Sequence, residues 1–185
     1  MLPSLASPLF TVNLKKDSIG NYNFGSIDSS EYIGNITYTP VITQQGFWQF
    51  KTSGYAIGST GKFVNRSINA IADTGTTLLL LPEPITLAYW STVVGAIYNQ
   101  TQGGYVFPCN AALPDFIFGI GTYHGMIPGQ YFNFSPVNET ICFGGIQPSG
   151  QVGVAIFGDI ALKSQFVVFD VGNTRLGWAA KELDS

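Results

Sequence analysis

The sequence carries little charge. Its 185 residues include only 8 Lys or Arg and 11 Asp or Glu, so charged residues make up 10% of the chain, against about 25% in an average soluble domain. The resulting net charge of −3 is negative, like the phosphates of nucleic acids, so the chain lacks the electrostatic attraction on which nucleic-acid binding depends. Because 45% of the residues are hydrophobic, the composition also excludes a disordered chain. We therefore expect one folded domain that binds no nucleic acid.

Histidine and cysteine are scarce, which limits nucleophilic and metal chemistry. A Ser-His-Asp or Cys-His system needs an imidazole, and the single histidine, His124, lies in a Gly-rich stretch, 119–129, that is typical of a surface loop. A structural zinc site needs about four Cys or His ligands, more than this chain contains. The glycine pair at 144–145 leads to Pro148 and indicates a turn rather than a phosphate-binding loop. We expect no metal and no cofactor.

Long apolar runs are also absent. A membrane-spanning helix needs roughly 18 consecutive apolar residues, and the longest candidates are interrupted at Asp73, Pro82, Gly158 and Asp170. Residues 1–10 have no basic start, and prolines and serines break their apolar stretches, which is not the pattern of a signal peptide. We expect no membrane association.

Glycosylation motifs are over-represented, and they favour secretion. Asn-x-Ser/Thr would occur about twice by chance in this composition, whereas the sequence has five sequons, at Asn35, Asn65, Asn99, Asn133 and Asn138. A secreted chain without an export signal indicates a mature or expressed fragment. Cys109 and Cys142, the two cysteines, are then either bridged or buried as free thiols. A bridge would restrict the unfolded chain by about 3.5 to 4 kcal/mol.

Strand signals dominate what the sequence does contain. Runs of β-branched and aromatic residues lie between Gly, Asn, Pro and Ser clusters, and they predict strands at 9–14, 36–41, 47–50, 67–72, 116–120 and 166–171. Apolar residues spaced by three and four from Ile85 to Ile97 predict one long helix that ends near Asn99. A short helix is expected at 159–164, capped by Asp159. The fold class is mostly β.

Asp73 is the carboxylate in the most unusual setting. An apolar strand leads into it, and the threonines and glycine of 74–77 follow before four leucines. A charge between two apolar runs needs hydrogen-bond donors. N–H groups near Gly75 and the hydroxyls of Thr74 and Thr76 are the expected donors. The alternative is an ordinary turn, because Asp-Thr-Gly arises by chance in roughly 4% of chains of this size.

The flanks of Asp73 extend the signal. The string I-A-D-T-G-T-T-L-L-L-L-P, residues 71–82, resembles the second catalytic loop of pepsin-like aspartic peptidases. Further segments resemble, in order, their counterparts in the C-terminal lobe of secreted fungal enzymes of the endothiapepsin and penicillopepsin type, at 7–10, 24–28, 46–48, 103–109, 142–146 and 156–159.

The resemblance implies a fold. It implies a single C-terminal lobe of the bilobal acid protease fold, with residues 1–30 forming crossover strands of the interlobe sheet and residues 31–185 forming the catalytic lobe. Residues 156–158 are similar to the element that passes beneath the catalytic loop in this family. The spacing of Cys109 and Cys142 suits the family's C-terminal-lobe disulfide. The other lobe's Asp-Thr-Gly motif and flap are absent from the sequence.

The resemblance also implies a mechanism, peptide hydrolysis at acid pH by a water held between two aspartates. Asp73 would supply one aspartate, Gly75 and Thr76 would donate to its carboxylate, and Thr74 would brace the loop against the other lobe. The expected partners are a peptide substrate, pepstatin-like transition-state analogues in the complete enzyme, and either an N-terminal lobe or a second copy of the chain.

Several residues are candidates for substrate binding. The resemblance implies backbone contacts from Gly75 and Thr77 and apolar pockets lined by Phe47, Ile71 and Leu80, although core packing explains the last three equally well. Leu80 stands where relatives often have Tyr, so the pocket there differs in shape. The alternative function is a non-catalytic binding or surface protein on the same fold. The intact D-T-G-T-T favours the enzyme.

Overall fold

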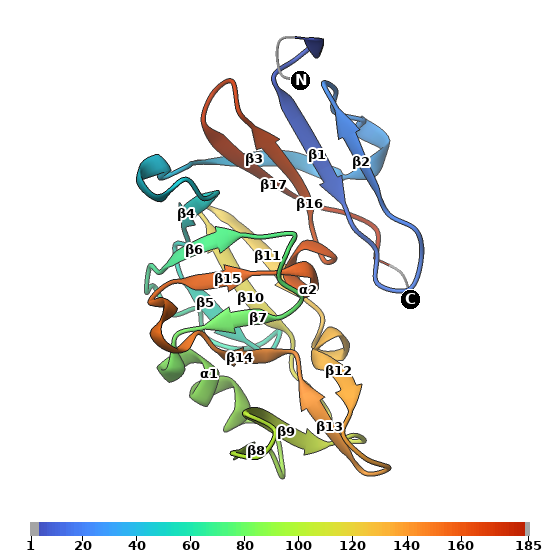
Figure 1. Cartoon of the computed structure of the whole chain (residues 1–185), viewed down its shortest axis with the longest axis vertical. Coiled ribbons are helices and arrows are strands. Elements are labelled where there is room, and N and C mark those ends of the chain that lie inside the picture. The colour runs from blue at the N-terminus through green and yellow to red at the C-terminus, as the bar shows by residue number, and fades with distance from the viewer. Residues whose placement is uncertain (1–3, 184–185) are drawn as a thin grey trace.

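A computed structural model describes residues 4–183 (Figure 1). The two α-helices in this part of the chain are α1 (Glu83–Trp90) and α2 (Asp159–Leu162). The strands are β1 (Leu9–Asn13), β2 (Asn21–Phe24), β3 (Ile33–Pro40), β4 (Gln49–Lys51), β5 (Tyr55–Ile57), β6 (Asn69–Ala72), β7 (Leu79–Leu81), β8 (Ile97–Asn99), β9 (Gly104–Pro108), β10 (Phe116–Ile120), β11 (Tyr123–Ile127), β12 (Asn133–Pro136), β13 (Ile141–Gly144), β14 (Ile146–Pro148), β15 (Ala155–Phe157), β16 (Phe166–Asp170) and β17 (Arg175–Ala180).

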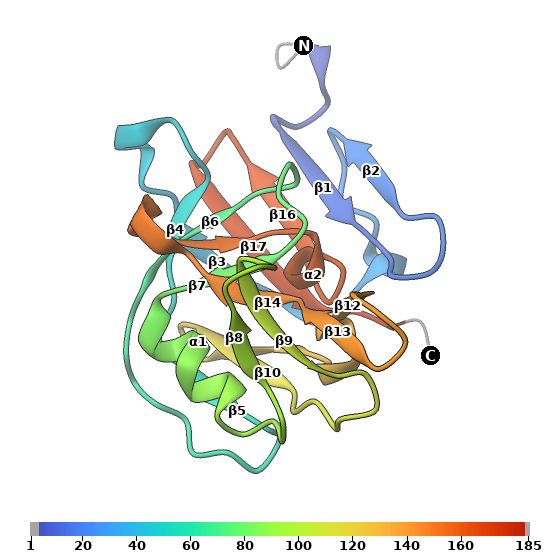
Figure 2. The same cartoon turned by 60° about the horizontal axis from the view of Figure 1, so that its bottom comes forward.

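The strands form four sheets. A five-stranded antiparallel sheet in the order β2-β1-β16-β17-β3 occupies the upper end of the molecule in Figure 1. A mixed sheet, β14-β7-β15-β6-β4, lies below it, with the sheet β11-β10-β5 behind the mixed sheet and the sheet β12-β13-β9-β8 at the lower end in the same view. Helix α1 lies beside β14 in both views (Figure 2), where the Trp90 indole N–H donates to the Ile146 carbonyl at 2.9 Å.

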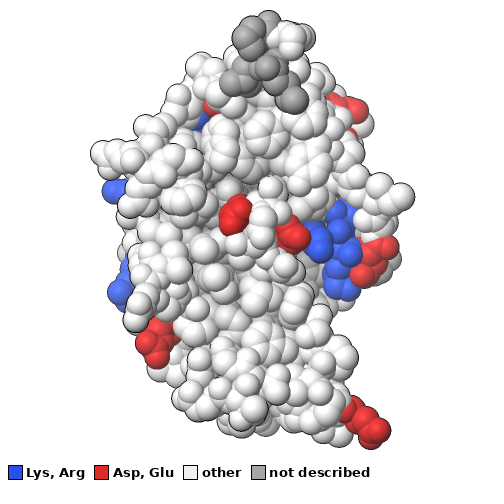
Figure 3. All heavy atoms as spheres, viewed as in Figure 1, with Lys and Arg blue, Asp and Glu red and all other residues white. Residues whose placement is uncertain are grey.

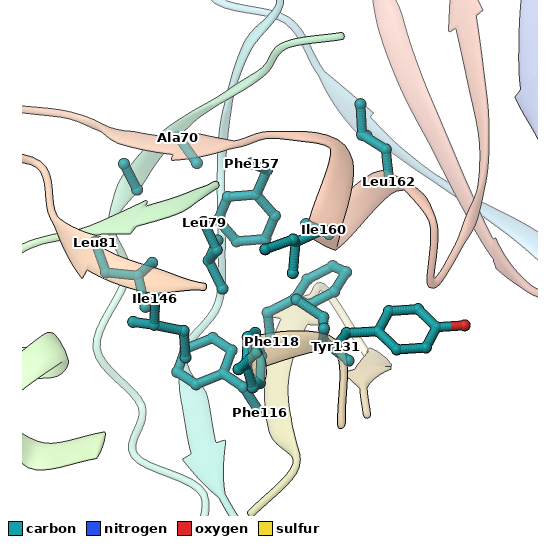
Figure 4. Packing of buried hydrophobic residues seen from close by; sticks show 14 of the residues in the cluster. Ala70, Leu79, Leu81, Phe116, Phe118, Tyr131, Ile146, Phe157, Ile160 and Leu162 are labelled. Carbon is teal, nitrogen blue, oxygen red and sulfur yellow. The ribbon is translucent and has the colours of Figure 1, made fainter. Parts of the chain in front are cut away.

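An aromatic cluster forms the centre of the main core. The ring of Phe157 in β15 lies 5.4 Å from that of Phe50, 5.1 Å from that of Phe118 and 6.3 Å from that of Trp178. All four side chains are fully buried, and burial of each stabilises the fold by about 1.5 to 3 kcal/mol. Figure 4 shows Phe157 beside Leu79 within this packing. Close packing of these rings around Phe157 therefore fixes the position of strand β15.

Both faces of the five-stranded sheet are covered. Val167 and Phe169 of β16 belong to the main core, whereas Phe166 and Val168 pack in a second cluster on the opposite face, with Tyr32 stacked on Phe166 at 5.1 Å. A strand buried on two sides appears in sequence as a continuous apolar run. The run at 166–171 accordingly predicted β16 nearly to its ends.

The sequence-based fold class is confirmed, since the chain is mostly β with one longer and one short helix. The predicted end of the long helix is wrong. The helix stops at Trp90, and residues 97–99 form β8 instead. The hydroxyls of Ser91 and Thr92 donate to the Leu87 and Tyr89 carbonyls at 2.7 and 2.6 Å, and Gly95 has a φ of +79°. Hydroxyls that bond the last carbonyls, followed by a left-handed glycine, favour termination.

The glycine-rich stretch 119–129, expected to be a surface loop, is mostly strand. Residues 119–129 contribute mainly to the β10–β11 hairpin, where His124 is exposed and stacks on Phe63 at 4.3 Å. At the glycine pair 144–145, where a turn was expected, Gly144 ends β13 and Gly145 forms a buried bend that leads into β14. A Cβ on Gly144 would lie 2.2 Å from the Trp90 ring, so the glycine permits close packing against α1.

The N-cap of the short helix lies one residue earlier in the chain than expected. Gly158 is the N-cap, Asp159 is the first helical residue and makes no side-chain capping bond, and Lys163 is the C-cap. Residues 1–3 of the expected 1–30 segment and residues 184–185 of the expected lobe lie outside the described residues. Within residues 4–183, no helix is long and apolar enough to cross a membrane.

Candidate active site

The candidate site lies where strand β15 runs between β6 and β7, the two strands that the Asp73 loop connects. Strand β15 pairs in parallel with β6 and antiparallel with β7, so Ile156 lies opposite both Ile71 and Leu80. The chain leaves β6 at Ala72, forms the loop that starts with Asp73, and returns as β7 on the other side of β15. Asp73 thus lies beyond the carboxyl ends of β6 and β15, a common position for functional groups in sheets with parallel strands.

Main-chain hydrogen bonds tie this loop to the segment that follows β15. The Asp73 N–H donates to the Phe157 carbonyl at 3.1 Å, and the Asp159 N–H donates to the Thr76 carbonyl at 2.7 Å. The Ile160 N–H donates to the Thr77 carbonyl at 3.0 Å. Because these bonds join both ends of the loop to the β15–α2 junction, the position of Asp73 does not depend on loop sequence alone.

Gly158 makes that close approach possible. A Cβ at this position would lie 2.2 Å from the Thr76 carbonyl oxygen and 2.5 Å from that of Leu78. Both distances are shorter than any that a side-chain carbon accepts, and both neighbours are backbone. Only glycine therefore lets the segment run directly beneath the loop.

Two donors orient the Asp73 carboxylate. The Gly75 N–H donates to Oδ1 at 2.9 Å, and the Thr76 hydroxyl donates to Oδ2 at 2.7 Å. The Thr74 hydroxyl was expected to donate as well, but Thr74 is exposed and, among residues 4–183, no such bond reaches the carboxylate. The turn brings the second and third residues after Asp73 over its side chain, as in an Asx turn, and the first residue faces outward.

The half-buried carboxylate keeps capacity for a further partner. A carboxylate has about four lone-pair sites, and the two bonds from Gly75 and Thr76 use only part of them. The group can therefore hold a water molecule or a second acid while its orientation stays fixed.

A second aspartate lies near the first. Burial raises the pKa of the Asp159 carboxyl, the Lys163 charge acts in the opposite direction, and the Asp73 charge raises it further. The net direction is upward. Figure 3 shows this face of the molecule, with separate acidic side chains near its middle and a cluster of basic side chains to the right of them.

The structure brings together two of the three predicted pocket residues. Ile71 is buried and Leu80 is half-buried, and Ile156 lies between them in one row across the mixed sheet. Ile156 was missed as a site residue, although its central place in the apolar run before Gly158 is a signal that could have identified it. Thr77 is exposed beside the loop.

Phe47 lies apart from that row. Its side chain is 54% exposed and lines a hollow of about 310 Å³ with Trp48 and Val171. Phe47 is connected to the Asp73 loop only through its neighbour Trp48, whose carbonyl accepts a hydrogen bond from the Ala72 N–H at 3.0 Å. Phe47 is therefore placed at the side of the candidate site by the backbone of its neighbour.

Other expected features can be located. Cys109 and Cys142 form a disulfide that joins the end of β9 to β13. Four of the five sequon asparagines are exposed and Asn99 is half-buried. Among residues 4–183, no group of three or more His, Cys, Asp or Glu side chains is arranged to hold a metal ion.

Comparison with known proteins agrees with the resemblance. The family model described as "Eukaryotic aspartyl protease" matches residues 3–181. Endothiapepsin of Cryphonectria parasitica is 53% identical over 181 residues, which cover 96% of this chain and 43% of that protein. Penicillopepsin-3 of Penicillium janthinellum is 54% identical over 95% of this chain and 45% of its own length. Aspergillopepsin-1 of Aspergillus oryzae is 53% identical, with 96% and 45% covered. The chain thus spans less than half the length of these relatives.

Proposed function

Because this chain belongs to the eukaryotic aspartyl protease family, we propose that it is the C-terminal half of a secreted aspartic endopeptidase and supplies one aspartate, Asp73, to a catalytic pair. The observation that carries the proposal is the Asp73 carboxylate itself. It is held by Gly75 and Thr76 on a loop tied to the β15–α2 junction, yet it remains half-exposed.

The proposed chemistry needs a second carboxyl group. Two carboxyl groups that share a site hold one proton between them, because both cannot ionise easily at close range. The ionised member removes a proton from the bound water, whose oxygen forms a bond to the peptide carbonyl carbon. The protonated member gives its proton to the carbonyl oxygen. When the C–N bond breaks, the first carboxyl group gives the proton taken from water to the leaving amine. The second carboxylate takes a proton from the diol as the carbonyl re-forms.

The second carboxyl group is proposed to come from another lobe. This chain covers only 43 to 45% of the relatives' length, which leaves room in those proteins for a second lobe. The edge strand β2 of the five-stranded sheet exposes Tyr22 by 44% and Phe24 by 56%, and Phe24 stacks on Phe10. This aromatic edge is suited to contact with an N-terminal lobe or with a second copy of the chain.

The division into crossover strands, 1–30, and catalytic lobe, 31–185, remains part of the proposal. Strands β1 and β2 fall in the first segment, while β3, β16 and β17 of the same sheet fall in the second. The two segments therefore share one sheet and would unfold together.

The proposed substrate is an extended peptide. The Thr77 and Gly75 backbones would contact its main chain, and Ile71, Ile156 and Leu80 would contact apolar side chains across the mixed sheet. Pepstatin-like transition-state analogues would bind the completed pair of aspartates. Secretion is supported by the Cys109–Cys142 disulfide, which suits an oxidising compartment.

An activity assay at several protein concentrations tests the proposal. We expect the monomeric chain to cleave a denatured protein near pH 3.5 at least about 100-fold more slowly than it does after addition of an N-terminal lobe, because one carboxyl group cannot act as both base and acid. Asp73→Asn should abolish the restored activity.

Two other outcomes have distinct meanings. Activity that rises with the square of protein concentration would indicate that two copies pair through Asp73. Activity that is proportional to concentration down to purely monomeric protein, and is lost in Asp73→Asn, would overturn the need for a second lobe.

A further inference from the structure

A small hollow opens beside the candidate catalytic loop. It has a volume of about 220 Å³, and its lining includes Thr77 of the loop together with Tyr131, Phe134 and Ile160. Tyr131 and Ile160 are buried, while Phe134 is 44% exposed. One wall of the hollow is therefore apolar, and the loop that carries Asp73 forms part of its edge.

Two lysines give this hollow a positive lining. Lys16 and Lys163 both line it, whereas the whole chain has only 8 Lys or Arg and a net charge of −3. The one carboxylate in the lining belongs to Asp17, which pairs with Lys16 at 2.7 Å. The Asp17 side chain is 70% exposed, so water screens this pair strongly. Among residues 4–183, Lys163 forms no salt bridge.

Acidic conditions leave the Lys163 ammonium group less compensated. Asp159 is the other carboxylate that acts on Lys163, and burial, with a further contribution from Asp73, raises its pKa against the lowering effect of Lys163. Asp159 therefore takes up a proton earlier than an ordinary aspartate as the pH falls. Asp17 is the carboxylate that faces Lys16, and Asp159 is the carboxylate that faces Lys163.

The geometry points to a subsite: we propose that the hollow formed by Lys16, Lys163, Thr77 and Ile160 binds an acidic side chain, Glu or Asp, of the peptide substrate. The inference rests on the proposed peptidase function and adds a substrate preference to it. Methylene groups of a glutamate would contact the Ile160 and Phe134 side, and its carboxylate would approach the two ammonium groups.

The distance from the reacting bond can be bounded. Thr77 is four residues from Asp73, and four Cα–Cα steps of 3.8 Å span at most about 15 Å. An extended peptide covers that length in about four to five residues. The favoured acidic residue should therefore lie within about four or five residues of the cleaved bond.

Binding to the chain itself provides a test that does not need activity. An octapeptide whose only charged side chain is one Glu, and its Gln counterpart, are titrated into the ¹⁵N-labelled chain at pH 5, where a free Glu is mostly ionised. The Glu position is moved along the peptide in a series. Protein made without glycosylation is used, because the sequon residue Asn133 also lines the hollow.

We expect one Glu position to bind about three- to tenfold more tightly than its Gln counterpart and to shift the amide signals of Lys16, Thr77 and Lys163. The double variant Lys16→Met and Lys163→Met keeps most of the side-chain volume and should reduce the ratio to about one. The control Lys62→Met removes an exposed lysine that does not line the hollow, and it should leave the ratio unchanged. Ratios within twofold of one at every position, or a ratio that survives the double variant, would overturn the inference.

Cleavage by the complete two-lobed protein separates this inference from the function on which it rests. If both peptides are cleaved at pH 5, the kcat/KM ratio of Glu to Gln should follow the binding ratio measured at that pH. If neither peptide is cleaved, the proposed function fails, and the binding ratio still decides whether the hollow selects an acidic side chain.

Discussion

At the scale of single residues, Gly158 and Thr76 control the position of the candidate catalytic carboxylate. Thr76 bonds Asp73 through its hydroxyl and bonds the Asp159 N–H through its carbonyl, so it connects the carboxylate to the segment beneath. Gly158 allows that segment to pass within contact distance of the Thr76 carbonyl. The site therefore depends on a residue without a side chain as much as on residues with one.

Gly158→Ala should be strongly destabilising. Its methyl group would overlap the Thr76 and Leu78 carbonyl oxygens, and relief requires movement of the backbone. We expect the free energy of unfolding to fall by about 2 to 4 kcal/mol, measured by urea denaturation.

Gly103→Ala is the matched control. Nothing lies within 4 Å of a Cβ there, and the φ of +68° carries only the conformational cost of replacing a glycine, about 1 kcal/mol. Equal losses in the two variants would contradict the steric argument.

The hydrogen-bond donors to the Asp73 carboxylate were more predictable from the sequence than the residues that line the site. Gly75 and Thr76 were predicted to hold Asp73, because the chemistry of a partly buried carboxylate requires nearby donors. Thr74 was wrongly included among the donors, because the sequence does not reveal which hydroxyl the turn brings inward. Ile156 was missed, since its place between Ile71 and Leu80 depends on pairing between distant strands. Lys163 was missed, since only the folded chain brings it to the same hollow as Thr77.

At the scale of elements, strands buried on both faces were the most predictable. The run at 116–120 coincides with β10, and the run at 166–171 ends one residue beyond β16. Short strands such as β7 and β14 were not predicted, because three residues give no period and their pairing is set by β15 and by one another. The end of α1 failed for a related reason, since the apolar spacing continues past Trp90 into β8.

The disulfide should contribute strongly to stability. Cys109 and Cys142 are 33 residues apart, and a loop of that size corresponds to about 3.5 to 4 kcal/mol of lost chain entropy in the unfolded state. In the double variant Cys109→Ala and Cys142→Ala, we expect the melting temperature to fall by about 7 to 15 °C.

Alkylation under denaturing conditions without reductant provides the control. Intact mass should show no added label, and it should show two labels after reduction. A decrease in melting temperature of less than about 2 °C in the double variant, or two labels without reductant, would contradict the assignment.

At the scale of the whole molecule, the scarcity of charge bears on acid tolerance. Arg175 pairs with Asp170 at 2.7 Å, and Lys16 pairs with Asp17; these are the salt bridges within residues 4–183. Few native ion pairs are lost when carboxylates become protonated. This agrees with a function at acid pH.

Asp170 should set the start of acid unfolding. Burial raises its pKa, but hydrogen bonds from Asn173 and Arg175 outweigh burial, so the pKa lies below its ordinary value. A lowered pKa contributes stability that is present above the unfolded value of about 3.9 and is lost as the pH falls through the folded value. We expect melting temperatures to change little from pH 7 to about pH 4 and to fall below it.

Asp170→Asn should lower the melting temperature at pH 7 and flatten the acid limb, because it removes the titrating group. Asp17→Asn, at an exposed pair, serves as the control and should change neither. Loss of most of the stability between pH 7 and pH 4 in the unaltered chain would contradict the expectation.

The insertion of β15 between β6 and β7 has a consequence for biosynthesis. Ile71 and Ile156 are about 85 residues apart in sequence, so the ribosome completes the Asp73 loop long before it makes the strand that positions it. At about 5 to 20 residues per second, the nascent loop waits roughly 4 to 17 seconds for its partner. During that interval the apolar strands on either side of the loop have no neighbour between them, which makes them targets for chaperones. A polypeptide released before residue 155 contains the Asp73 loop but lacks β15, so it cannot assemble the site.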